Sequence, residues 1–116
     1  MSLTIDHREQ GGCAVLVVHG ALDVETSPDL RTAAFAAIQA DPGPVIIDAS
    51  ELSFCDSTGL GVFVRVAARL DTRGQRLAIA GAPPPVRDIL EETGLAEAFV
   101  VTGTVTEATS RLRASS

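Results

Sequence analysis

The 116-residue chain is long enough to bury a hydrophobic core, and its 46% hydrophobic and 21% charged residues exclude a disordered segment. Its net charge of −6, without a cluster of Lys or Arg, argues against a nucleic-acid partner, because affinity for nucleic acids comes largely from neutralised phosphates. Only 3% of the residues are aromatic, so the core is expected to be aliphatic, joined by Phe35, Phe54, Phe63 and Phe99.

Cysteine usage and hydropathy indicate the cellular compartment. Cys13 and Cys55 stand apart, with no zinc-ligand spacing around them, which favours two buried thiols in a reducing compartment over a disulfide. The sequence has no signal peptide and no apolar run of about 18 residues. A soluble cytoplasmic protein that does not associate with membranes is therefore expected.

The first elements are predicted to form a β-hairpin. Residues Leu3–Asp6 alternate between apolar and polar, as a half-buried strand does, and Glu9–Gly12 has the composition of a turn. Cys13–His19 is a continuous apolar run, which is typical of a strand covered on both faces. Gly20–Asp23 then leads away from this strand.

A helix is predicted to follow. Either Ser27 caps it with Pro28 at the first helical position, or Thr26 caps it and Asp29 closes a capping box, and the sequence does not separate these alternatives. The helix is expected to end near residues 41–43. Its apolar face is predicted to consist of Leu30, Ala34, Ala37 and Ile38.

The next strand is predicted at Pro44–Asp48, a short, apolar and β-branched run that is typical of the centre of a sheet. A strand, a helix and another strand indicate a right-handed βαβ unit with parallel strands. Residues 49–53 are interpreted as a connector, which Leu52 and Phe54 hold to the core.

A long helix is predicted after Ser57. At about 100° per residue, its buried face is expected to hold Leu60, Phe63, Val64, Ala67 and Leu70. The opposite face carries Arg65, Arg69 and Arg73. Val62 and Val66 fall near the arginine side. Val62 is either an ordinary surface residue or, with Thr58, part of a partner-binding patch.

The remaining sequence is predicted to alternate between strands and helices. The expected elements are a strand at Arg76–Gly81, a helix at Val86–Glu92, a strand at Phe99–Val101 and a helix at Thr104–Arg113 capped by Thr104. All elements together predict an α/β fold in one domain, residues 1–116. Its sheet is expected to be mixed, with an antiparallel first strand and parallel inner strands.

Polar chemistry is concentrated in residues 54–64, where an apolar strand passes into the long helix. Ser57 is placed to cap free backbone N–H groups, which is worth on the order of 1 kcal/mol. Gly59 and Gly61 each cost roughly 1 kcal/mol of helix stability relative to Ala. Two such glycines indicate a steric demand, either the approach of another backbone or tight packing on the sheet.

Enzymatic and ligand-binding alternatives are not favoured. Around Ser57 only half of the nucleophile elbow Gly-x-Ser-x-Gly is present, and His7 and His19 lie in predicted strands, so no catalytic residue is assigned. Residues 59–61 lack the Gly-Lys-Ser/Thr of a phosphate-binding loop, so no cofactor is predicted. No metal site is predicted either, although one end of the sheet is expected to collect Asp23, Asp48 and Asp56.

Residues 56–63, Asp-Ser-Thr-Gly-Leu-Gly-Val-Phe, closely resemble the signature of STAS-domain anti-sigma factor antagonists, also called anti-anti-sigma factors. Residues 20–23 fit the family's Gly-x-Leu-Asp turn, and residues 45–54 fit its central strand and connector. Residues 84–95 resemble its third-helix region. Because the resemblance covers nearly the whole chain in the right order, it implies a single STAS domain, with about five strands and about four α-helices.

The resemblance also implies a phosphorylation switch. In that family the serine directly after the Asp, here Ser57, is phosphorylated by the anti-sigma factor, which is an ATP-dependent serine kinase. The unphosphorylated antagonist binds this kinase and frees the sigma factor, and a PP2C-type phosphatase restores the active form. Thr58 is the rival phosphate acceptor. The partner-binding surface is expected to include Asp23, Asp56, Ser57, Thr58, Gly59, Gly61 and Val62.

One position departs from the family pattern. Ala21 stands where many members carry a charged residue, and it is expected to face the partner, so the departure bears on the identity of the partner more than on the fold. The alternative function is a non-switching STAS subunit of a transporter or signalling complex.

Overall fold

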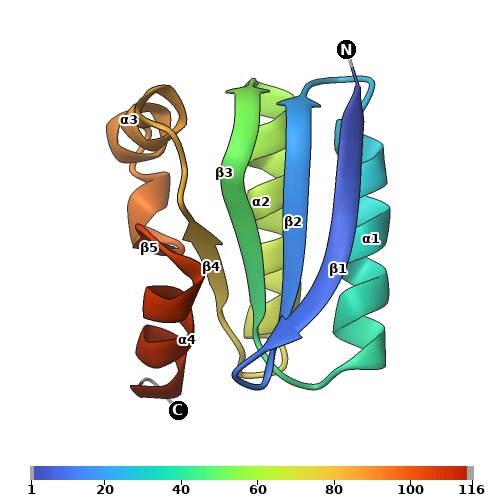
Figure 1. Cartoon of the computed structure of the whole chain (residues 1–116), viewed down its shortest axis with the longest axis vertical. Coiled ribbons are helices and arrows are strands. Elements are labelled where there is room, and N and C mark those ends of the chain that lie inside the picture. Colours follow the sequence, from blue (N-terminus) through green and yellow to red (C-terminus); the bar gives the residue numbers. More distant parts are fainter. Residues whose placement is uncertain (1, 115–116) are drawn as a thin grey trace.

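The computed structural model describes residues 2–114 and contains one five-stranded sheet with helices on both faces (Figure 1). The predicted α/β architecture is confirmed. In chain order the elements are β1 Leu3–Gln10, β2 Cys13–Leu22, α1 Ser27–Ala40, β3 Val45–Cys55, α2 Ser57–Asp71, β4 Leu77–Ala80, α3 Pro84–Glu92, the 3₁₀ turn η1 Leu95–Glu97, β5 Val100–Thr102 and α4 Val105–Ala114.

The strands lie in the order β1-β2-β3-β4-β5, with β1 antiparallel to β2 and the other pairs parallel, as predicted. The hairpin turn is shorter than the predicted turn at residues 9–12, because Glu9 and Gln10 belong to β1 and pair with β2. Gly11 and Gly12 alone make the turn, with φ of 60° and 80°. Glycine adopts such positive φ angles without steric cost.

The third strand is longer than predicted. Residues 49–53 were interpreted as a connector, but β3 continues to Cys55 because β2 continues beside it to Leu22. The register of the pairing between β2 and β3 shifts along this stretch. Gly20 pairs with Leu52 and Ala21 with Phe54, so Ser53 is left over and its hydroxyl donates to the Gly20 carbonyl oxygen at 2.9 Å.

This irregularity decides where Phe54 points. In a regular strand Leu52 and Phe54 would share a face, because side chains alternate. With the extra residue between them, Leu52 is buried while Phe54 is 44% exposed. The prediction that Phe54 joins the core was therefore wrong, and the one for Leu52 is confirmed.

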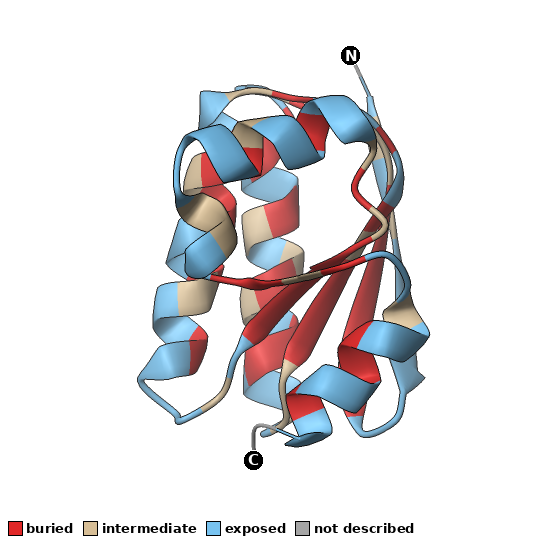
Figure 2. Ribbon diagram, turned by 90° about the vertical axis from the view of Figure 1, so that its left-hand side faces the viewer, coloured by how far each residue is buried: buried red, intermediate tan, exposed pale blue. Residues whose placement is uncertain are grey.

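The core has two parts, one on each face of the sheet. Residues of α1, α2 and α3 cover one face, and α4 covers the other through Ala108 and Leu112. Figure 2 shows the buried residues on the strands and on the helix sides that face them. Phe63 and Phe99 meet edge to face at 6.2 Å between ring centroids. Cys13 and Cys55 are buried free thiols, as predicted.

Helix α2 is buried on two sides, toward the sheet and toward α1. Leu60, Phe63 and Leu70 are buried as predicted, but Val64, which was expected on the same face, is 41% exposed. Val62 and Val66, which were expected near the exposed side, are only 6% and 0% exposed because α1 packs along α2. A helix angle computed for one buried face cannot show this second neighbour.

The remaining elements follow the predictions with shifted ends. Thr104 caps α4, since its hydroxyl oxygen accepts a hydrogen bond from the Glu107 N–H at 3.0 Å. Within residues 2–114, no helix is both long enough and apolar enough to cross a membrane.

Candidate functional site

Four segments meet at one end of the sheet, where β2 and β3 finish and α1 and α2 begin (Figure 1). The Asp56 N–H donates to the Leu22 carbonyl oxygen at 3.1 Å, which ties the end of β3 to the end of β2. The hydroxyls of Ser27 and Thr58 are 3.3 Å apart and join the starts of the two helices. The signature residues of α2 and the loop after β2 therefore form one surface.

Asp56 caps α2, and the prediction that Ser57 does so was wrong. The Asp56 Oδ1 atom accepts hydrogen bonds from the backbone N–H groups of Thr58 at 2.9 Å and Gly59 at 3.2 Å, and from the Thr58 hydroxyl. The hydrogen bond from the Thr58 hydroxyl contributes most to holding the pKa of the Asp56 carboxyl below its usual range, and the bonds from the backbone N–H groups lower this pKa further. Asp56 is thus an ionised, fixed carboxylate beside Ser57.

Ser57 is the first residue of α2, and its side chain is exposed. In the part of the chain that the structure describes, its hydroxyl has no hydrogen-bond partner. Thr58 is also exposed, but its hydroxyl is engaged with both Asp56 and Ser27. Of the two candidate acceptors, Ser57 alone presents an uncommitted hydroxyl to solvent.

The loop between β2 and α1 is fixed by Asp23. Its Oδ1 accepts from the backbone N–H groups of Glu25 and Thr26, each at 3.0 Å. These bonds, that of Thr26 above all, lower the pKa of the Asp23 carboxyl. The Thr26 hydroxyl donates to the Ala21 carbonyl oxygen at 2.7 Å and accepts from the Asp23 N–H at 2.9 Å.

This arrangement overturns both predicted caps of α1. Thr26 occupies the cap position, but its hydroxyl binds backward to the strand end and makes no cap hydrogen bond. The N–H of Asp29 is bound by the Thr26 carbonyl oxygen instead. Ala21, which was expected to face the partner, is buried within β2.

Two exposed apolar residues at this end were missed from the sequence. Val24, at the tip of the Asp23 loop, is 69% exposed, and Phe54 lies at the end of β3. Val24 carried a signal that could have been used, because it sits between Asp23 and Glu25 in a turn and outside any apolar periodicity. Phe54 carried none, since its exposure depends on the slipped pairing of β3.

The two signature glycines lie in different surroundings. A Cβ atom built on Gly59 would lie 2.8 Å from the side chains of Leu22 and Cys55, so Gly59 serves packing inside the domain. A Cβ atom on Gly61 would meet nothing within 4 Å. Gly61 instead lines an open hollow of about 310 Å³ between α1 and α2, whose other lining residues are Val24, Ser27, Pro28, Arg31, Thr58, Val62 and Arg65.

The three acids considered for a metal are not gathered. Asp48 lies within β3, where its Oδ1 accepts from the Ser50 N–H at 3.1 Å and the Ser50 hydroxyl at 2.7 Å. Asp23 and Asp56 each accept hydrogen bonds from backbone N–H groups of the residues that follow them, at the end of the sheet. Among residues 2–114, no three His, Cys, Asp or Glu side chains are grouped so that they could hold a metal ion.

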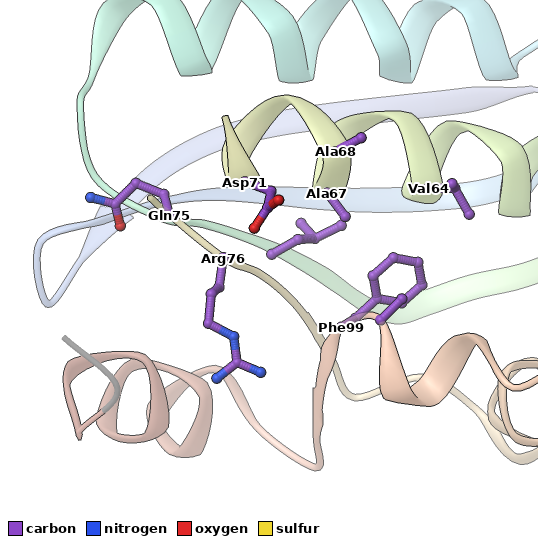
Figure 3. Close-up of a pocket in the computed structure, with 9 residues that line it drawn as sticks. Val64, Ala67, Ala68, Asp71, Gln75, Arg76 and Phe99 are labelled. Atoms are coloured by element: carbon purple, nitrogen blue, oxygen red, sulfur yellow. The ribbon is translucent and has the colours of Figure 1, made fainter. Parts of the chain in front are cut away.

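A second hollow, also of about 310 Å³, opens on the other side of α2 (Figure 3). It lies between the second half of that helix, the start of β4 and Phe99. Its polar rim includes Asp71, Gln75 and Arg76, so a carboxylate and a guanidinium both line it. No signature residue reaches this hollow.

Comparison with known proteins identifies the family. The family model described as Mlab, STAS domain, matches residues 5–103, and the chain belongs to the STAS domain family. It is 32% identical over 95 residues to the anti-sigma-B factor antagonist of Staphylococcus aureus, covering 82% of this chain and 88% of that protein. It is 30% identical over 96 residues to the anti-sigma F factor antagonist of Paenibacillus polymyxa, covering 82% of each.

The fold agrees with that of solved relatives. The crystal structure of an anti-sigma factor antagonist from Mycobacterium paratuberculosis superposes with a TM-score of 0.86 at 26% identity, covering 97% of this chain and 95% of that one. The family and fold predicted from the sequence are therefore confirmed.

Proposed function

We propose that this protein is an anti-sigma factor antagonist of the cytoplasm that is switched by phosphorylation of Ser57. In its unphosphorylated form it binds an anti-sigma factor that is an ATP-dependent serine kinase, and the sigma factor is released. Phosphorylation ends the binding, and a PP2C-type phosphatase reverses it. The protein is a substrate and a binding partner, with no catalytic role of its own. The names of its relatives in Staphylococcus and Paenibacillus support the antagonist role.

The observation that carries the proposal is the state of the Ser57 hydroxyl. It is exposed at the first residue of a helix and makes no hydrogen bond within the described chain, so a kinase can reach it without breaking an internal contact. Phosphorylation of Thr58 would break its contacts with Asp56 and Ser27, which connect the two helix starts. These contacts favour Ser57 as the acceptor.

The surroundings of Ser57 also favour a switch that acts at the interface. A phosphate adds roughly −1.5 to −2 charges. A helix N-terminus ordinarily attracts an anion, but the N–H groups of Thr58 and Gly59 already bind Asp56. The phosphate would therefore stand in solvent beside a carboxylate, and its bulk and charge would act against the partner while α2 stays folded.

The partner surface is proposed to surround Ser57. Val24 and Phe54 supply exposed apolar area on its flanks. Thr58, Gly61 and Val62 contribute through the hollow between α1 and α2. Asp23, Asp56 and Gly59 contribute indirectly, because their hydrogen bonds and packing fix the backbone that carries this surface.

The test is co-purification from the native host, followed by phosphorylation with the captured kinase and ATP. We expect one phosphate on wild type and on Ser110→Ala, a control in α4, and none on Ser57→Ala. Ser57→Asp should lose the partner while keeping the thermal stability of wild type. A Ser57→Ala protein phosphorylated to the same extent would refute the site. Recovery of a transporter ATPase instead of a kinase would favour the alternative STAS-subunit function.

A further inference from the structure

The groove between α1 and α2 extends well beyond the residues around Ser57. The hollow of about 310 Å³ at the starts of the two helices shares Arg31 and Arg65 with a further hollow of about 410 Å³ along the same helices. This further hollow reaches Phe35 and Thr72. On α2 the groove follows residues spaced three or four apart, which share one helix face. They run from Thr58 to Thr72, which spans about 21 Å at roughly 1.5 Å per residue.

The groove collects cations without carboxylates. Arg31, Arg65 and Arg69 line it, and no Asp or Glu does. Within residues 2–114, none of these three guanidinium groups has a carboxylate within 4.0 Å. The hollow of Figure 3, by contrast, is lined by a carboxylate, Asp71, as well as by Arg76.

The floor of the groove is apolar. Val62 lies at one end, and Ala68 and Phe35 lie toward the other, with the Arg69 guanidinium 5.5 Å from the centre of the Phe35 ring. That contact holds one cation in place at the edge of the apolar floor. An apolar trough with a cationic rim is complementary to a helix that has one apolar face and acidic residues beside it.

We propose that the α1–α2 groove binds an acidic amphipathic helix of the anti-sigma factor, an inference that rests on the proposed function. A small anion would occupy only one end of a trough about 21 Å long, which is the length of roughly four helical turns. A bilayer is disfavoured because the chain as a whole carries a net charge of −6, which an anionic lipid surface would repel. The groove begins at Thr58, so a helix seated in it would anchor the kinase next to Ser57 through contacts separate from the phosphate acceptor.

The experiment uses the anti-sigma factor captured by the wild-type protein and measures its affinity for charge variants. Arg65→Glu/Arg69→Glu should bind about 100-fold more weakly, because like charges across an interface are strongly unfavourable. Arg65→Gln/Arg69→Gln should lose about tenfold and should weaken less than wild type when salt is raised from about 50 to about 300 mM. The matched control is Arg8→Glu/Arg87→Glu, which changes the net charge equally on exposed residues of β1 and α3 and should bind as wild type does.

The occupant is identified by a photo-crosslinking residue at position 72, which lines this groove and not the hollow of Figure 3. We expect crosslinks to one acidic segment of the anti-sigma factor with apolar residues spaced three or four apart. Arginines in place of its acids should restore binding to Arg65→Glu/Arg69→Glu. Thermal unfolding of each variant shows that it is folded.

The outcomes separate this inference from the proposed function. If wild type captures no anti-sigma factor, both fail. If Ser57→Asp releases a captured anti-sigma factor but the arginine variants bind as tightly as wild type, only the groove inference fails. Crosslinks to a basic or non-helical segment would overturn it as well, as would sedimentation of wild type, but not of the arginine variants, with phosphatidylglycerol vesicles.

Discussion

The same substitution at two nearby glycines of α2 should change stability in opposite directions. In Gly59→Ala the new Cβ atom would lie 2.8 Å from Leu22 and Cys55, both buried, and such overpacking costs about 1–3 kcal/mol. The higher helix propensity of Ala returns about 1 kcal/mol. We expect a net loss of about 1 kcal/mol. In Gly61→Ala nothing lies within 4 Å of the new atom, so the helix gains up to about 1 kcal/mol.

Thermal and urea unfolding measure this difference. With an unfolding entropy of about 2.1 cal/mol/K per residue, 1 kcal/mol corresponds to about 4 °C for a chain of this length. Gly59→Ala and Gly61→Ala should therefore differ by about 8 °C in Tm. The control removes the Leu22 side chain that the new Cβ atom would meet. In a Leu22→Ala background, Gly59→Ala should lower the free energy of unfolding clearly less than it does in wild type. Two variants that both gain stability would refute the packing role assigned to Gly59.

Three further predictions concern the core, the helix cap and the thiols. Phe63→Ala should lower the free energy of unfolding by about 3–5 kcal/mol, because Phe63 is fully buried against Phe99, and urea unfolding measures it. The lowered pKa of Asp56 means that its stabilisation is present above the usual carboxyl pKa and is lost as the pH falls through the folded-state pKa. The Tm of Asp56→Asn should accordingly fall less steeply than that of wild type below about pH 5. Burial, helped by the Asp56 carboxylate, raises the pKa of Cys55 to about 12, so iodoacetamide at neutral pH should label it only after unfolding.

The order and type of the main elements could be predicted because each depends on local pattern. The continuous apolar run of β2 and the β-branched start of β3 are visible in the sequence and lie where they were expected. Strand ends were less predictable, because a strand continues for as long as a neighbour is available. Residues 49–55 extend β3 beside β2 although their own composition suggests a connector.

Several site residues depended on tertiary contacts that no local pattern contains. Val62 is buried by α1, a helix whose position relative to α2 cannot be read from periodicity. Phe54 is exposed because one unpaired residue changes the strand's alternation. At the helix start, Asp56 and Ser57 are both good capping residues. The structure assigns the cap to Asp56, and this leaves the Ser57 hydroxyl uncommitted.

The strand order of the sheet repeats the order of the strands along the chain. Every strand is thus added beside its immediate predecessor, and no later segment has to insert between strands that are already paired. The hydrogen bonds described around Ser57 join residues of β2, α1, α2 and the turns beside them, so they can form on the ribosome before β4 has been synthesised. In that nascent state the apolar edge of β3 lacks its neighbour. We expect this edge, which β4 later covers, to be the region most exposed to misassembly during synthesis.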